Sequence, residues 1–317
     1  MKNELIESAK IALFKCLCLK RQEHLLVVCD PPCLEVGQAL WEAGRDYCRE
    51  AVMVTISPRK QSGSEPPDRI AELFGNFDVA VMPTSKSLSH TQARRNASAK
   101  GTRIATLPGI TTEVFCRALK VDWDRLSMYT RRITTALSRS RIITITSKAG
   151  TSFTFKTGGR EAHTDDGRIG SKGAFSNLPA GESYMAPLEG TAEGTLVFDG
   201  SFGFGGVLKK PLVLQVKKGK VVDVEDHPLK KELESLFDRF HAPARNIAEF
   251  GVGTNPSARV SGVILEDEKV LGTIHVAVGD NASMGGVVHV PLHLDGIMLQ
   301  PTVLLDNKVW MEKGKLV

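Results

Sequence analysis

The first part of the chain alternates short apolar runs with segments of helical periodicity. The runs His24–Cys29, Ala51–Ile56, Asp78–Met82 and Arg103–Leu107 have the unbroken apolar character of strands buried on both faces of a parallel sheet. Between and after them, apolar residues recur at helical spacing over residues 4–20, 34–47, 68–74, 89–100 and onward to about 136. This alternation predicts an open, mostly parallel α/β sheet of the Rossmann-like kind.

A sheet of this kind often binds a ligand beyond the carboxyl ends of its strands. The turn after Cys29 reads DPPCLEVG, which lacks the glycines of a phosphate-binding loop, and no G-x-x-x-x-G-K-[ST] motif occurs. We therefore assign no nucleotide to this part of the chain, and a structural or substrate-lining role is the simpler interpretation.

The pattern changes near residue 140, where pairs of strands separated by turn residues begin. Three hairpins are predicted, over residues 141–156, 212–224 and 303–311. A helix is expected over Pro228–His241, because proline suits a first helical position and Leu229, Leu233 and Phe237 form one apolar face. The chain is thus predicted to be α/β plus α+β, with an α/β domain at 1–139 and a largely antiparallel, metal-binding domain at 140–317.

The stretch Gly272–Met298 carries three of the eight histidines, together with Asp295. If Val287–Leu299 is a strand, His289, His293 and Asp295 share one face, which is a metal-chelating arrangement. An unpaired charge within this apolar segment would be costly, which favours a metal ion. The alternative for each residue is a solvated or hydrogen-bonded side chain.

Several acidic residues precede this stretch. Glu182 lies in a turn-rich segment between prolines, Glu249 is followed by glycines, and Glu266–Glu268 comes shortly before His275. Each acid alone is most simply a cap, a turn residue or a surface charge. Together with the histidines they supply the nitrogen and oxygen donors that Zn²⁺, Co²⁺ and Mn²⁺ bind.

Composition excludes some classes of protein. The net charge of +5 arises from interspersed charges without an aromatic and basic platform, which argues against a nucleic-acid partner. No apolar run reaches the ~20 residues of a membrane span. The six cysteines form no C-x-x-C pair and no secretory signal is evident, so we expect reduced thiols and a cytoplasmic protein.

The motifs of the second half resemble those of the aminopeptidase T group of metallopeptidases. The matching text is NLPAGE followed by AP, then AEFGVGTNP, then DEK and GT before HVAVGDN, and finally GG followed by HLD. The first half is also similar, from the opening helix through HLLVVCD and the helix after it.

The resemblance implies a homodimeric aminopeptidase that removes N-terminal residues from small peptides by means of a metal-activated water. It also implies one or two divalent ions per chain, zinc, cobalt or manganese, held by Glu182, Glu249, His275, His293 and Asp295. Glu182 or Glu249 would then be catalytic and pass a proton to the leaving amine.

The chain departs from the peptidases in its shorter length and in the absence of a tyrosine soon after His275. A related branch, the 2,5-dihydroxypyridine dioxygenases, resembles it in length and in the G-x-N, GG and H-x-D text, and implies a ring-cleaving enzyme with one Fe(II). That branch has histidine at the position of Glu249 and serine at that of His275, so these two residues favour the peptidase. The third alternative is a non-catalytic member that binds a small molecule.

Overall fold

The computed structural model describes residues 2–317, which form two compact units. The first comprises the chain up to Ser127 together with Asp165–Ala180, and the second comprises Met128–Thr164 and Gly181–Val317. These units differ from the predicted ranges 1–139 and 140–317, chiefly because the segment after Asp165 returns to the first unit. That residues 1–139 and 140–317 form two separately folding domains stays a prediction.

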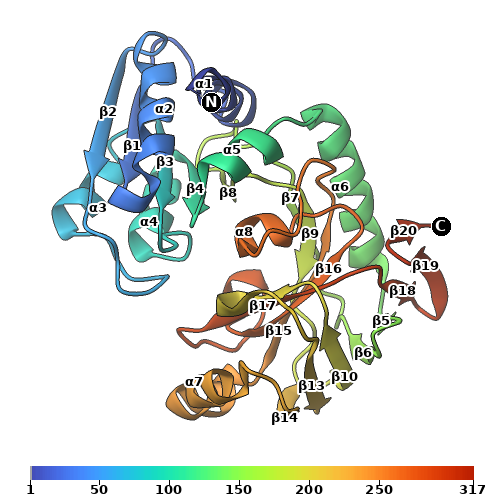
Figure 1. Cartoon of the computed structure of the whole chain (residues 1–317). Helices are drawn as coiled ribbons and strands as arrows, with labels where there is room; N and C mark the ends of the chain where they lie inside the picture. The colour runs from blue at the N-terminus through green and yellow to red at the C-terminus, as the bar shows by residue number, and fades with distance from the viewer. Residues whose placement is uncertain (1) are drawn as a thin grey trace. The chain divides into compact units, whose positions relative to one another are not determined.

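The sheet of the first unit is parallel throughout, as predicted (Figure 1). Its strand order is β2-β1-β3-β4-β8. The strands are β1 His24–Cys29, β2 Glu50–Thr55, β3 Val79–Thr84, β4 Arg103–Pro108 and β8 Phe175–Asn177. Only β8 had no counterpart in the sequence pattern, because its three residues are too few to show a periodicity.

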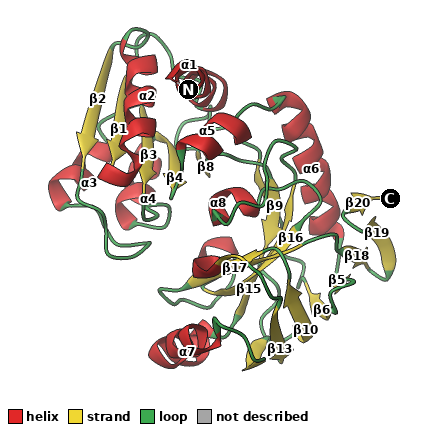
Figure 2. Ribbon diagram, in the orientation of Figure 1, coloured by secondary structure: helices red, strands yellow, loops and turns green. Residues whose placement is uncertain are grey.

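Helices join these strands (Figure 2). They are α1 Lys2–Lys10, α2 Leu34–Arg45, α3 Asp68–Phe74, α4 Gln92–Lys100 and α5 Thr112–Ala118, with the π-helix η1 Ile11–Cys16 and the short η2 Pro31–Cys33. Helix α4 shows how local sequence sets the ends of a helix. The Thr91 hydroxyl accepts a hydrogen bond from Arg94 N, and Gly101 ends the helix with a positive φ of 106°.

Arg103 ties the end of η1 to strand β4. Its guanidinium donates to both carboxylate oxygens of Glu23, at 3.0 and 2.6 Å, and to the carbonyl of Leu17 at 2.9 Å. The side chains of Arg103 and Glu23 are only 5% and 12% exposed. A bidentate pair at this depth is strongly destabilising to break, because one charge is left buried without its partner.

We expect Arg103→Ala to lower the free energy of unfolding by about 3 kcal/mol. The matched control is Arg69→Ala, which removes an i,i+3 pair whose side chains are 88% and 65% exposed and should change stability by less than about 0.5 kcal/mol. Urea denaturation followed by circular dichroism measures both variants. Equal losses would show that Arg103 has no special role in stability.

The second unit is largely antiparallel, as predicted, and its strands form two sheets, a number that the sequence did not indicate. The first has the order β14-β13-β10-β6-β5-β18-β19-β20, and the second has the order β12-β11-β17-β16-β15-β9-β7. The strands of the first sheet are β5 Ile142–Thr146, β6 Ser152–Lys156, β10 Glu193–Phe198, β13 Leu212–Lys217, β14 Lys220–Val224, β18 Thr302–Leu305, β19 Lys308–Glu312 and β20 Lys315–Leu316. All three predicted hairpins pair within it.

The second sheet carries the residues of interest. Its strands are β7 His163–Asp165, β9 Glu182–Met185, β11 Ser201–Phe202, β12 Gly206–Val207, β15 Ile247–Gly253, β16 Ile274–Gly279 and β17 His293–Met298. The remaining helical elements are α6 Trp123–Arg139, α7 Lys230–Ala244, α8 Ile264–Asp267, η3 Gly203–Gly205 and η4 Ala282–Met284.

An apolar core joins the two sheets of the second unit. Phe155 of β6 and Phe250 of β15 are both buried, with ring centroids 5.5 Å apart. Val252, Val276 and Met185 belong to the same core. Because side chains alternate along a strand, the neighbours of these residues in sequence point to the opposite face of the second sheet.

No helix within residues 2–317 is long and apolar enough to cross a lipid bilayer.

Candidate metal centre

Four adjacent strands of the second sheet, β9, β15, β16 and β17, supply the predicted donor residues to one face. Glu249 pairs with Ala277, and Ala277 pairs with Asp295, so these three side chains form one row across the sheet. In the next row Tyr184, Gly251 and His275 are paired in the same way. The donors therefore come together through strand register, although they are far apart in the sequence.

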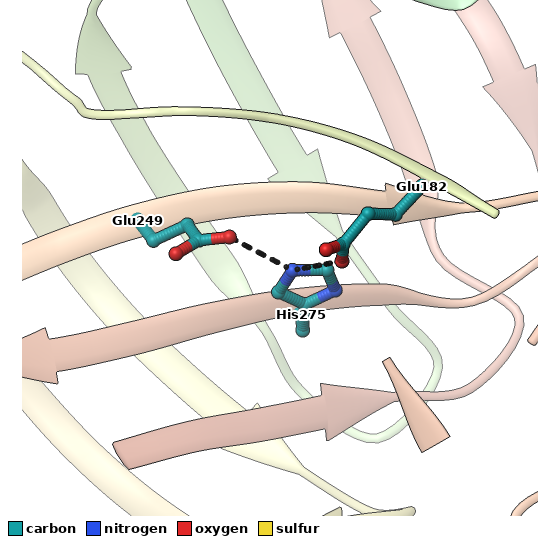
Figure 3. A group of neighbouring side chains, drawn as sticks. All are labelled: Glu182, Glu249 and His275. Atoms are coloured by element: carbon teal, nitrogen blue, oxygen red, sulfur yellow. Dashed lines mark hydrogen bonds and ion pairs between the residues drawn. The ribbon is translucent and has the colours of Figure 1, made fainter. Parts of the chain in front are cut away.

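The first group of donors consists of Glu182, Glu249 and His275. Nε2 of His275 lies 3.3 Å from Glu182 Oε2 and 3.2 Å from Glu249 Oε1. Both carboxylates are directed at the imidazole ring (Figure 3). All three residues are buried, and their ligand atoms lie within 4.8 Å of one another.

The second group consists of Glu249, His293 and Asp295, also within 4.8 Å. Nε2 of His293 lies 3.2 Å from Glu249 Oε2 and 3.6 Å from Asp295 Oδ1. Nδ1 of His293 lies 2.9 Å from the carbonyl oxygen of Asp280, and only a protonated Nδ1 can donate to a carbonyl. In the neutral ring this leaves Nε2 as the lone-pair nitrogen, which is the form that binds a metal.

Glu249 belongs to both groups, with one carboxylate oxygen facing each. The structure thus brings together all five residues named from the resemblance, and their role as ligands remains a proposal. Each group has one histidine and two carboxylates. Among residues 2–317, no such group contains both His275 and His293, so the two histidines belong to different triads.

Small residues make room for these side chains. A Cβ at position 251 would lie 2.0 Å from His275 Nε2, so only glycine leaves space for the imidazole. A Cβ at position 253 would lie 2.1 Å from the carbonyl of Val270, so Gly253 admits the backbone next to Lys269. The motif AEFGVGTNP therefore combines a donor, Glu249, with two glycines that other parts of the site require.

Lys269 and Glu268 were not among the predicted site residues, although Lys269 is buried next to the site and the Glu268 side chain is only 13% exposed. Lys269 is fully buried, and its ammonium donates to Glu182 Oε1 and to Glu268 Oε1, each at 2.6 Å. The sequence did not indicate this role, because the lysine in ILEDEK follows three acidic residues, and such a run of charges is usually exposed. Only the structure shows that this lysine balances two buried carboxylates.

The electrostatics of the metal-free site reflect competition between burial and opposite charge. Burial raises the pKa of Glu182 to about 8 and that of Glu268 to about 7, against the lowering effect of Lys269. Burial likewise raises the pKa of Glu249, but its contacts with His275 and His293 outweigh this and bring the pKa well below the usual range. Burial lowers the pKa of His275, yet Glu249 and Glu182 raise it overall to about 9.

The donor atoms fit a metal cation. Glu182 Oε2 and Asp295 Oδ1 are buried and, within residues 2–317, form no hydrogen bond, although an imidazole Nε2 lies 3.3 Å from the first and 3.6 Å from the second. An unsatisfied buried carboxylate oxygen is costly, and coordination of a divalent ion relieves that cost. Carboxylate and imidazole donors suit Fe²⁺, Mn²⁺, Co²⁺ and Zn²⁺ alike, so the donor set by itself does not select one metal.

Three local expectations need correction. The strand expected over Val287–Leu299 begins only at His293, because the glycine-rich turn and Pro291 keep the preceding residues in a loop. His289 is therefore not on the face of His293. Its side chain is 90% exposed and bonds Asp280 Oδ2. Glu182 opens strand β9 instead of lying in a turn, and its pairing with Gly253 sets its position.

Comparisons with known proteins identify the family. The family model described as 2,5-dihydroxypyridine 5,6-dioxygenase matches residues 52–317, which include all five candidate ligands. This chain belongs to the 2,5-dihydroxypyridine 5,6-dioxygenase family. A curated relative of that name from Pseudomonas putida KT2440 is 26% identical over 243 residues, covering 73% of this chain and 69% of the relative.

Solved structures agree on the fold. The structure of 2,5-dihydroxypyridine dioxygenase from Pseudomonas putida KT2440 gives a TM-score of 0.86 at 20% identity, covering 100% of this chain and 98% of that one. Wild-type AmpT from Thermus thermophilus gives 0.74 at 17% identity, covering 100% and 99%. The chain therefore has the same fold as both of these proteins.

The aminopeptidase interpretation was wrong. The family model and the curated relative both indicate an oxygenase, so hydrolysis of peptides and proton transfer to a leaving amine by Glu182 or Glu249 are set aside. Glu249 and His275 resemble the peptidases, whereas the length of the chain resembles the dioxygenases. Ligand residue types recur in unrelated chemistries, so they do not fix the reaction.

Gly251→Ala should weaken divalent-metal binding by at least about tenfold, because the new methyl group displaces the His275 ring. Gly251 has no positive φ, so the substitution tests space and not backbone strain. The control is Gly200→Ala in the same unit, where the nearest atom would be 3.1 Å from the added Cβ. Competition with a chromogenic chelator measures both affinities, and equal values would contradict this role of Gly251.

Metal affinity should rise with pH between about 6.5 and 9. The pKa of His275 is raised from 6.5 to about 9, so in this window the metal-free ring holds a proton that an incoming ion must displace. The same raised pKa stabilises the metal-free fold below pH 6.5, and this contribution is lost as the pH rises through 9. Calorimetry of Zn²⁺ binding in buffers of different ionisation enthalpy should reveal proton release, and its absence would contradict the assignment.

Proposed function

We propose that this chain is a metal-dependent, ring-cleaving dioxygenase that acts on a small dihydroxylated nitrogen heterocycle. The observation that carries the proposal is the family match over residues 52–317, which spans the entire set of buried donors. The curated relative of the same description supports the same class of substrate.

The proposed metal is Fe(II), held by Glu249, His293 and Asp295, with His275 and Glu182 on the other side of Glu249. These side chains hold the ion, and the hydrogen bond from His293 Nδ1 to the Asp280 carbonyl keeps that ring in the metal-binding orientation. Iron at such a site supplies the redox chemistry needed to activate dioxygen.

A stacked pair of rings, His163 and Tyr184, involves the strand that carries Glu182. Tyr184 follows Glu182 by two residues on β9, so the two side chains share a face. The His163 ring stacks on Tyr184, with centroids 5.2 Å apart and planes inclined by 22°. Aromatic faces favour offset stacking with planar rings, so this pair supports a role in orienting a heterocyclic substrate.

The proposal has two forms, one with a single metal ion per chain and one with two. Glu249 presents one oxygen to each group, which is compatible with one ion on the His293 side or with two ions bridged by Glu249. Metal analysis of protein reconstituted anaerobically with Fe(II) gives this number directly. The expected homodimer remains a prediction that size-exclusion chromatography with light scattering tests.

Anaerobic loading with Fe(II), followed by aerated 2,5-dihydroxypyridine, should consume about one molecule of dioxygen per molecule of substrate. Asp295→Asn keeps the volume but removes one charged oxygen donor, and should lower the rate at least about tenfold. An oxygen electrode and loss of the ring absorbance follow the reaction. Iron-loaded protein that consumes no oxygen with any of a panel of dihydroxylated pyridines and pyrimidines would refute the proposed function.

A further inference from the structure

The loop between β16 and β17 contacts the His293 side chain, whose backbone pairs with Gly279 in the sheet. It spans residues 280–292, and its first residue, Asp280, provides the carbonyl that accepts from His293 Nδ1. Much of the loop is exposed, including Val287 at 81%, while Met284 and Val290 are buried at 6% and 7%. Apolar burial alone therefore gives this loop only a few points of attachment.

Glu189, in the connection between β9 and β10, provides a polar anchor. Its Oε1 accepts hydrogen bonds from Asn281 Nδ2 and from the backbone N of Val287, both at 2.9 Å. Its Oε2 accepts from Arg160 Nη2 at 2.5 Å. Arg160 is in turn fixed by donating to the Pro187 carbonyl at 2.6 Å. One carboxylate therefore binds the loop with one oxygen and a guanidinium with the other.

Asn281, which Glu189 holds, also forms hydrogen bonds within the loop. Its amide oxygen accepts from Val288 N at 2.9 Å, and its backbone N donates to the Val288 carbonyl at 3.1 Å. Gly286 leaves room for it, since a Cβ there would lie 2.0 Å from Asn281 Cγ. Asn281 directly follows Asp280, so the residue that Glu189 holds is covalently joined to the residue that orients His293.

The Glu189 carboxyl stays ionised over the ordinary pH range, so its hydrogen bonds to the loop do not depend on pH. Burial raises the pKa of its carboxyl, but Arg160 and the Val287 amide outweigh this effect and lower the pKa to about 2. The side chains of Arg160 and Glu189 are 16% and 20% exposed, so solvent only partly screens the pair. Charge-assisted hydrogen bonds of this kind are stronger than neutral ones.

We propose that Glu189, held by Arg160, is a positioning residue that fixes the 280–292 loop and thereby sets His293 Nε2 for metal binding. The inference rests on the proposed function only in requiring a divalent ion at Glu249, His293 and Asp295. The hydrogen-bond partners of Glu189 are Arg160, Asn281 and Val287, none of which is a candidate ligand, so it acts through Asn281, Asp280 and His293 in turn.

Glu189→Gln tests this inference, because an amide has a single acceptor oxygen and cannot serve both Arg160 and the loop. We expect Co²⁺ affinity to fall about 10- to 100-fold. We also expect altered visible absorption bands of the Co²⁺ complex, since His293 is displaced from its position. Arg160→Lys, which keeps the charge but loses the planar fork, should give a smaller loss of the same kind.

The matched control is Glu234→Gln. Glu234 pairs with Arg245 at 2.5 Å, with side chains 28% and 25% exposed, in the same unit but without contact to any candidate ligand. This variant should keep the wild-type Co²⁺ affinity and spectrum even if it loses similar stability. Should Glu189→Gln fail to fold, the Arg160→Lys comparison decides the question.

The outcomes separate the two proposals. Equal Co²⁺ affinity and spectra in wild type, in Glu189→Gln and in Arg160→Lys would overturn the positioning role alone. Wild type that binds Co²⁺ but, loaded with iron, consumes no oxygen would overturn the dioxygenase proposal and leave the positioning role standing. Wild type that binds no divalent ion would overturn both.

Discussion

The burial of several carboxylates on one face of a β-sheet is the constraint on which the site depends. Glu182, Glu249, Glu268 and Asp295 are all largely withdrawn from water, and ionised carboxylates in such surroundings need cations close by. The Lys269 ammonium provides one positive charge beside Glu182 and Glu268, and the two imidazoles provide more when protonated. A divalent ion replaces those protons, which is why metal binding, protonation and stability are linked at this site.

The register of the strands places large donor side chains next to very small residues on the face that carries the site. Large donors alternate with Gly251, Gly253 and Ala277 on the same face, while the opposite face of the same strands packs into the phenylalanine-rich core. A shift of one residue in β15 would turn Glu249 into that core, so the register is fixed by the apolar face as much as by the site. The stability of the second unit and the geometry of the donors thus have the same origin.

The sequence was sufficient for the parallel sheet, because unbroken apolar runs such as His24–Cys29 allow few other folds, and for the hairpins, because turn residues mark them. It was not sufficient for Glu182, whose place depends on pairing with Gly253 across a long separation, or for Lys269, whose burial no local pattern shows. Strand periodicity indicated His293 and Asp295, the resemblance to a family completed the set of five donors, and the structure brings them together. The reaction could not be read from them, since the same donors serve hydrolysis and oxygen chemistry.

Charge balance bears on the number of ions. When both imidazoles are neutral, the four ionised carboxylates named above and the Lys269 ammonium give the site a net charge of −3. One divalent ion changes this net charge to −1, and two divalent ions change it to +1. The pKa values of Glu182 and Glu268, raised by burial to about 8 and about 7, mean that one of this pair readily keeps a proton near neutral pH. That proton belongs to the metal-free site, because a divalent ion beside Glu182 lowers the pKa of its carboxyl and displaces the proton. The number of ions that the site holds is therefore coupled to the number of protons that it releases on binding them.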